Sequence, residues 1–132
     1  MHPRLSHICL HVDNLDDCVE FYQRYCQLKV VEDLTSEGKG SVYIAESDAQ
    51  PRLIIQLMLG GKPLEIDPQS ERHFGFEVDT REEVDRIADM ANQEGILLFE
   101  ADEYAPGVYL CTVKDPNGNP VEFSFNHYLP NR

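Results

Sequence analysis

The chain has little positive charge and no long apolar segment. It carries 11 Lys and Arg against 24 Asp and Glu, which gives a formal net charge of −13. A surface this acidic repels phosphate backbones and anionic membranes, so neither nucleic acid nor a membrane is an expected partner. No apolar run approaches the roughly 20 residues of a membrane span. The first residues also lack the apolar run of a secretory signal, and we therefore expect a cytoplasmic protein.

The four cysteines are spread along the chain, at Cys9, Cys18, Cys26 and Cys111. They form no CxxC pair, so a structural zinc knuckle is not indicated, and in a cytoplasm they should be free thiols. With 132 residues, 42% of them hydrophobic, the chain is long enough to bury a core. We expect a single domain over residues 1–132.

One eight-residue pattern occurs twice. The first copy, residues 7–14, reads HICLHVDN, and the second, residues 73–80, reads HFGFEVDT. The offset is 73 − 7 = 66, which is half of the 132 residues. In both copies apolar residues alternate with others, as in a strand with one apolar face, and the initial histidine lies on the opposite face. The chain is therefore predicted to contain an internal duplication, with modules over residues 1–66 and 67–132.

Each half is predicted to form a strand, a helix and three further strands. Asn14 precedes a helix that should run to about Gln27, and Thr80 and Glu83 should form a capping box at the start of the second helix, with Gly95 at its end. The pair Val-Tyr recurs at the same offset, at residues 42–43 and 108–109. The remaining strands are expected over residues 28–34, 42–44, 53–59, 96–99, 108–110 and 121–125, with a linker over 60–68 and a turn over 115–118.

Four polar residues occupy symmetric positions in these strands: His7, Gln56, His73 and Glu122. Gln56 and Glu122 are separated by 122 − 56 = 66 residues; Gln56 stands in an otherwise apolar strand, and Glu122 is flanked by Val121 and Phe123. A carboxylate in such a place is costly unless it is solvated, paired or bound to a metal. A lone strand histidine is usually only a satisfied polar residue, but four such residues in a symmetric set predict a mixed nitrogen and oxygen site for Zn, Ni, Co, Mn or Fe(II).

These residues resemble the vicinal oxygen chelate superfamily, which includes glyoxalase I, extradiol dioxygenases, fosfomycin-resistance enzymes and bleomycin-binding proteins. The resemblance rests on the two histidine-led strands, on Phe21-Tyr22 in the first helix, and most specifically on Asp115-Pro-Asn-Gly-Asn-Pro-Val-Glu-Phe. It implies an α+β fold of paired βαβββ modules that form a cup-shaped mixed sheet with helices outside. It also implies one divalent metal ion held by His7, Gln56, His73 and Glu122, commonly in a homodimer.

The resemblance favours a glyoxalase-I-like lyase or isomerase, in which metal-assisted proton abstraction takes place beside a carbonyl of a small molecule. Glu122 is the expected base, since Gln56, which stands where bacterial glyoxalase I usually has Glu, cannot accept a proton. One alternative is an Fe(II) extradiol-type dioxygenase, which needs two His and one Glu, with His11, Tyr43, Tyr109 or His127 as the acid or base. Another alternative is a metal-free drug-binding module, which the acidic charge suits.

Overall fold

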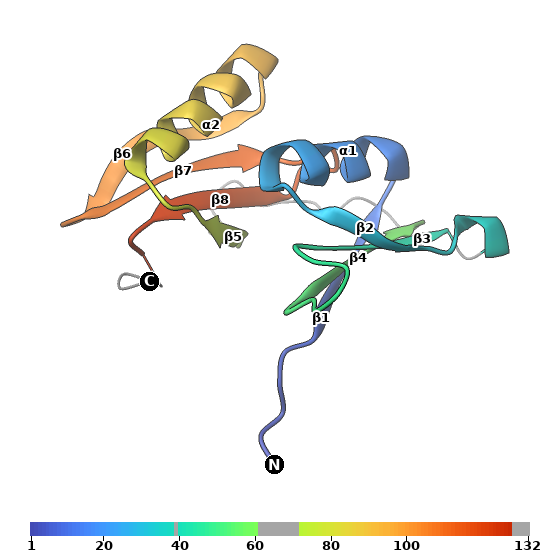
Figure 1. Ribbon diagram of the computed structural model, residues 1–132. Helices are drawn as coiled ribbons and strands as arrows, with labels where there is room; N and C mark the ends of the chain where they lie inside the picture. The colour runs from blue at the N-terminus through green and yellow to red at the C-terminus, as the bar shows by residue number, and fades with distance from the viewer. Residues whose placement is uncertain (39, 61–71, 128–132) are drawn as a thin grey trace. The chain divides into compact units, whose positions relative to one another are not determined.

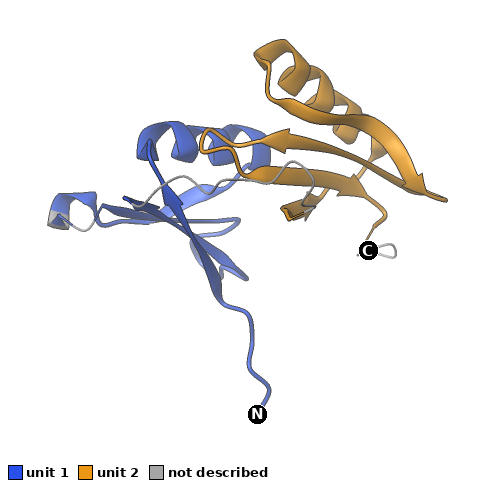
Figure 2. Cartoon of the chain, turned by 180° about the vertical axis from the view of Figure 1, so that it is seen from behind, with its two compact units in different colours: residues 1–64 blue, residues 65–132 orange. Residues whose placement is uncertain are grey.

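The structure is a computed structural model that describes residues 1–38, 40–60 and 72–127 (Figure 1). The chain divides into two compact units, Met1–Leu64 and Glu65–Arg132, which we call module 1 and module 2 (Figure 2). The division falls within the predicted linker, most of which lies outside the described residues. The organisation of both modules as a single domain stays a prediction. None of the helices in the described ranges is long and apolar enough to span a membrane.

Both modules have the predicted order of elements. Module 1 contains β1 (His7–Val12), α1 (Leu15–Cys26), β2 (Lys29–Asp33), the short 3-10 helix η1 (Thr35–Glu37), β3 (Ser41–Ala45) and β4 (Ile54–Leu59). Module 2 contains β5 (Phe74–Glu77), α2 (Arg81–Glu94), β6 (Leu97–Ala105), β7 (Val108–Lys114) and β8 (Pro120–Phe125). The strand orders are β1-β4-β3-β2 and β5-β8-β7-β6, and in each sheet only the first pair is parallel. The predicted α+β fold of paired βαβββ modules is confirmed.

Helix α1 begins and ends at residues that suit its termini. The Asn14 side chain accepts a hydrogen bond from the backbone N–H of Asp17 at 3.1 Å, which satisfies one of the unpaired donors of the first turn. At the other end Gln27 adopts the left-handed conformation, with φ of 55°, and its N–H bonds back to the carbonyl of Tyr22. The predicted limits of this helix are confirmed.

Helix α2 departs from the prediction at one contact. The Thr80 hydroxyl accepts from the N–H of Glu83 at 3.1 Å, as a capping box requires, and Gly95 ends the helix with φ of 75°. The Glu83 carboxylate instead receives two hydrogen bonds from the Arg86 guanidinium, at 2.6 and 3.0 Å. A charged, bidentate partner one turn along the helix outcompetes a neutral backbone N–H for this carboxylate.

Each helix covers one face of its own sheet with an apolar stripe. In module 1 the stripe is Cys18, Phe21, Tyr22 and Tyr25, and in module 2 it is Val84, Ile87, Ala88 and Ala91. Both stripes are buried, α1 against β3 and β4 and α2 mainly against β7 (Figure 1). The other face of each sheet is therefore left for polar side chains.

The duplication holds in the sheet register at the predicted ligand positions. Gln56 pairs with Cys9, and Glu122 pairs with Gly75, so that both partners are related by the same offset, 9 + 66 = 75 and 56 + 66 = 122. A polar residue of the fourth strand thus lies beside the first strand at equivalent places in both modules.

The predicted equivalence of the Val-Tyr pairs at residues 42–43 and 108–109 is wrong. Tyr43 pairs with Gln56, whereas the residue that pairs with Glu122 is Thr112, three positions beyond Tyr109. The loop after β3 has 54 − 45 − 1 = 8 residues and the loop after β7 has 120 − 114 − 1 = 5, so the three-residue shift is cancelled before β8. Because the shift is odd, Tyr109 lies on the helix face of its sheet, where its hydroxyl donates to Asp85 of α2 at 2.5 Å.

Three predicted strand limits also differ from the structure. Strand β7 extends to Lys114, four residues beyond the predicted end at Leu110. Strand β6 extends to Ala105, six residues beyond the predicted end at Phe99, because it pairs along most of β7 with several register shifts. Strand β5 begins at Phe74, so His73 immediately precedes the strand that it was expected to open.

Candidate metal centre

In module 1, strands β1 and β4 present polar side chains on the face of the sheet opposite α1. His7, Cys9 and His11 alternate along β1 and are all exposed, while the residues between them turn toward the core. The register places Gln56 beside Cys9 and Met58 beside His11, on the same face. This module therefore presents two of the predicted ligands, His7 and Gln56, on one polar surface.

The two predicted ligands of module 1 each have one polar atom engaged by a serine. The Gln56 amide nitrogen donates to the hydroxyl of the buried Ser41 at 3.0 Å, which leaves the amide oxygen as the candidate ligand atom. His7 Nδ1 lies 2.8 Å from the hydroxyl of Ser6, which makes Nε2 its candidate ligand atom. A ring nitrogen held in this way fixes the orientation of an imidazole toward a metal.

The structure brings the other two predicted ligands together in module 2. His73 Nε2 lies 3.4 Å from Glu122 Oε1, and the Glu122 residue is only 7% exposed between Gly75 and Thr112 of the neighbouring strands. Two ligand atoms that are each about 2.1 Å from a tetrahedral ion lie about 3.4 Å apart. The imidazole and the carboxylate are thus already separated by the distance that a shared metal ion requires.

No group of three His, Cys, Asp or Glu close enough to hold a metal ion occurs in the part of the chain that the structure describes. The two pairs of predicted ligands belong to different modules, so each pair is described on its own. The four-ligand set of His7, Gln56, His73 and Glu122 stays a prediction.

Gly75 is the residue that lets β5 lie against Glu122. A Cβ at this position would lie 2.9 Å from the Glu122 carbonyl oxygen and 3.1 Å from its Cβ, so the backbone would have to move. We expect Gly75→Ala to lower the free energy of unfolding by about 2 kcal/mol, which is typical of overpacking, and to weaken metal binding by separating His73 from Glu122. Urea unfolding and metal titration measure the two effects.

Gly95→Ala is the control for this prediction. Its added Cβ meets no atom within 4 Å, but φ of 75° imposes a cost of about 1 kcal/mol, so stability alone should change. An unchanged unfolding midpoint and metal affinity in Gly75→Ala would contradict the proposed role of the close approach.

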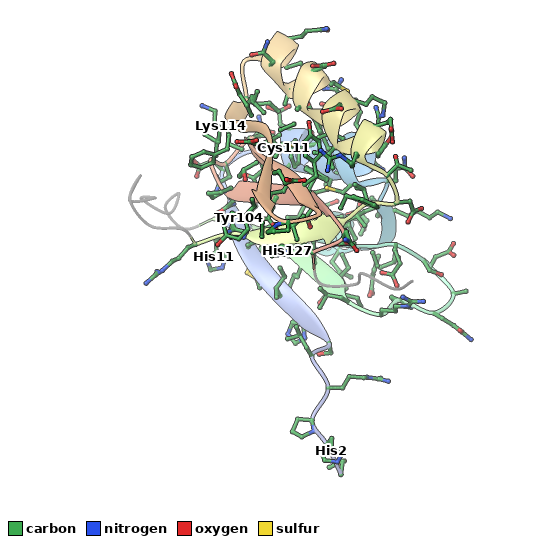
Figure 3. All side chains as sticks on the ribbon, turned by 90° about the vertical axis from the view of Figure 1, so that its left-hand side faces the viewer. His2, His11, Tyr104, Cys111, Lys114 and His127 are labelled. Atoms are coloured by element: carbon green, nitrogen blue, oxygen red, sulfur yellow. The ribbon has the colours of Figure 1, made fainter. Side chains whose placement is uncertain are left out.

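A second polar group lies further along the same face of module 2. The Glu77 carboxylate accepts from the Ser124 hydroxyl at 3.1 Å and from the backbone N–H of His127 at 3.2 Å. The rings of His127 and Tyr104 meet edge to face, with centroids 5.9 Å apart (Figure 3). Alternation with Glu122 places Ser124 on this face from the sequence, but the approach of Tyr104 depends on the unpredicted length of β6.

Among the described residues near this site, Cys111 has a strongly shifted pKa. It is buried on the opposite face, where its thiol lies 3.8 Å from the carbonyl of Val84 in α2 (Figure 3). Burial raises the pKa of the Cys111 thiol to about 12, and the negative charges of Asp85 and Glu122 add to the shift. The thiol is therefore protonated at neutral pH, which makes it a poor nucleophile.

Comparison with known proteins gives a consistent result over nearly the whole chain. A family model described as the glyoxalase/bleomycin resistance protein/dioxygenase superfamily matches residues 4–123. A Pseudomonas aeruginosa protein described as uncharacterized is 38% identical over 130 residues, which are 98% of this chain and 93% of that protein.

Solved structures share the fold at lower identity. The fosfomycin resistance protein FosX from Listeria monocytogenes matches with a TM-score of 0.77 and 20% identity over 97% of both chains. A variant of that protein complexed with Mn(II) and 1S,2S-dihydroxypropylphosphonic acid matches with a TM-score of 0.78 and 19% identity over 97% of this chain and 95% of that one. The trypanothione-dependent glyoxalase I of Leishmania major matches with a TM-score of 0.67 and 20% identity over 92% and 86%. At these identities the solved structures establish the fold.

Proposed function

The chain belongs to the glyoxalase/bleomycin resistance protein/dioxygenase superfamily, and on this basis we propose that it is a divalent-metal-dependent enzyme that removes a proton beside a carbonyl group of a small molecule. This places it with the glyoxalase-I-like lyases and isomerases of the family. The ion would be held by His7, Gln56, His73 and Glu122, and Zn, Ni, Co, Mn or Fe(II) suits such a nitrogen and oxygen set.

The observation that carries the proposal is the pairing of His73 with Glu122. A largely buried carboxylate needs a partner, and the imidazole nitrogen at 3.4 Å provides one at a separation that also suits a shared ion. A bound divalent ion would supply Lewis acidity toward an oxygen of the substrate. The Mn(II) complex of the FosX variant, which shares the fold, further supports a metal in this chain.

Glu122 is the residue to which we assign the proton transfer. It is the only carboxylate in the proposed set, and the amide of Gln56 has no basicity at neutral pH. Gln56 instead contributes an oxygen that Ser41 helps to orient, and His73 keeps the Glu122 carboxylate in place. All four residues would therefore bind the ion, and Glu122 alone would also accept the proton.

The alternatives are an Fe(II) extradiol-type dioxygenase and a metal-free drug-binding module. A pure binding module would have no need of four polar residues at symmetric positions, which favours a metal enzyme. Homodimer formation and a cytoplasmic location remain predictions. Assays of the metal-loaded protein with hemithioacetals, catechols, acyl-CoA thioesters and fosfomycin would separate the enzyme classes.

Metal binding is the direct test. We expect the purified protein to bind about one divalent ion per chain, and His73→Ala and Glu122→Ala each to weaken that binding by about tenfold or more, because each removes a ligand. Elemental analysis and competition with a chromophoric chelator measure stoichiometry and affinity.

Matched controls come from the second polar group of module 2. His127→Ala and Glu77→Ala change the same residue types on the same sheet face and should leave metal affinity near that of the wild type. If His73→Ala and Glu122→Ala bind the ion as tightly as these controls do, the proposed centre is wrong.

A further inference from the structure

Module 1 has a cluster of sulfur and nitrogen donors that the proposed divalent centre does not use. It consists of Cys9 and His11 on β1 and Met58 on β4. We propose that this soft-donor cluster binds a monovalent, thiophilic metal ion, Cu(I), through the Cys9 thiolate, His11 Nε2 and the Met58 thioether.

The geometry of His11 and Met58 supports this proposal. His11 Nε2 lies 3.3 Å from Met58 Sδ, and the register pairs these residues directly across β1 and β4. A nitrogen about 2.0 Å and a sulfur about 2.3 Å from a shared ion lie about 3.5 Å apart at a tetrahedral angle. The imidazole and the thioether therefore already stand at the separation of two ligands of one ion.

The third donor, Cys9, is placed near His11 by the spacing of residues along β1. Cys9 precedes His11 by two residues, so both side chains emerge on one face about 6.6 Å apart along β1. The Met58 side chain has three rotatable bonds and can adjust to a position between them. Cys9 and His11 are both exposed, which leaves their side chains accessible to an ion.

The donor types decide which ion fits. Thiolate and thioether sulfur are soft ligands that select Cu(I), whereas the oxygen atoms of Gln56 and Glu122 suit harder divalent ions. One thiolate also balances the single positive charge of Cu(I), which leaves a neutral site. Cys and Met are usually buried for packing, so an exposed Cys9 and a half-buried Met58 on the face that carries His11 form an arrangement that packing does not require.

The test is an anaerobic titration of the full chain with Cu(I) in competition with the chromophoric chelator bicinchoninate. We expect the wild type to withdraw one equivalent of Cu(I), and Cys9→Ser, His11→Ala and Met58→Leu each to weaken that binding by about tenfold or more. Cys26→Ser, His2→Ala and Met90→Leu make the same three changes outside the cluster and should bind like the wild type.

Two further variants separate this site from the divalent centre. His73→Ala and Glu122→Gln alter only module 2 and should retain Cu(I) binding even where divalent binding is lost. Circular dichroism of every variant verifies that the fold is intact. The proposal is overturned if the wild type takes no Cu(I) from bicinchoninate, if Met58→Leu binds as tightly as Met90→Leu, or if the module 2 variants lose Cu(I).

Discussion

Glu122→Gln is expected to lower turnover by about two orders of magnitude or more, the usual scale for a lost general base. The substitution keeps the shape of the side chain and an oxygen that can bind a metal, but it removes the basicity. Since His73 Nε2 lies 3.4 Å from Glu122 Oε1, the amide can still share an ion with the imidazole, and much of the metal should remain bound. The measurement is turnover per bound metal ion, with metal content determined on the same sample.

Glu77→Gln is the matched control, because it makes the same change on the same face of module 2, where Glu77 accepts hydrogen bonds from Ser124 and His127. It should affect turnover far less than Glu122→Gln. Wash-in of solvent deuterium at the substrate carbon gives a second readout, because a dioxygenase has no such exchange to lose. Full turnover in a metal-loaded Glu122→Gln protein would show that another group is the base.

Asp115→Ala should cause the largest loss of stability, about 3 kcal/mol, because hydrogen bonds to a buried charge are each worth about 1.5–3 kcal/mol. Asp115 is 2% exposed and organises the turn between β7 and β8. Its carboxylate accepts from the backbone N–H groups of Asn117 and Asn119, at 2.9 and 2.8 Å, and from the Asn119 side chain at 3.0 Å. Alanine leaves these donors without their acceptor, and the turn that delivers β8 and Glu122 is loosened.

Thermal unfolding followed by circular dichroism tests this expectation, and a loss of 3 kcal/mol corresponds to a fall in Tm of about 10 °C in a chain of this size. The control is Asp33→Ala, since Asp33 holds the N–H and hydroxyl of Thr35 in a similar local turn but is exposed. Water can replace its hydrogen bonds, so the Tm should fall much less. Equal Tm values for the two variants would mean that burial of the Asp115 carboxylate adds nothing.

The sequence predicts the fold well because the duplication leaves a regular pattern. A single ungapped offset relates Gln56 to Glu122, and the structure confirms that their neighbours on the first strands, Cys9 and Gly75, follow the same offset. The predicted equivalence of Tyr43 and Tyr109 fails for a physical reason. The position equivalent to Tyr43 lies three residues later in β7, and the loop after β7 is three residues shorter than the loop after β3, so the two changes cancel. A comparison without gaps cannot detect two changes that compensate.

The site is predicted less completely than the fold. Alternation along a strand identifies the face on which Glu122 and Ser124 lie, because side chains in a strand have a period of two. It does not give the separation of His73 from Glu122, which depends on the absence of a side chain at Gly75. The contact of Tyr104 with His127 depends on the length of β6, which pairing with β7 determines rather than local sequence.

Two fully buried thiols can report local opening of the chain. Cys18 belongs to the buried face of α1 in module 1, Cys111 lies on β7 beneath α2 in module 2, and neither has exposed surface. An alkylating reagent can reach either sulfur only when its helix separates from its sheet, and burial also keeps the Cys111 thiol in its unreactive protonated form. Pulsed alkylation read out by mass spectrometry thus reports whether the two modules open independently or as one cooperative unit.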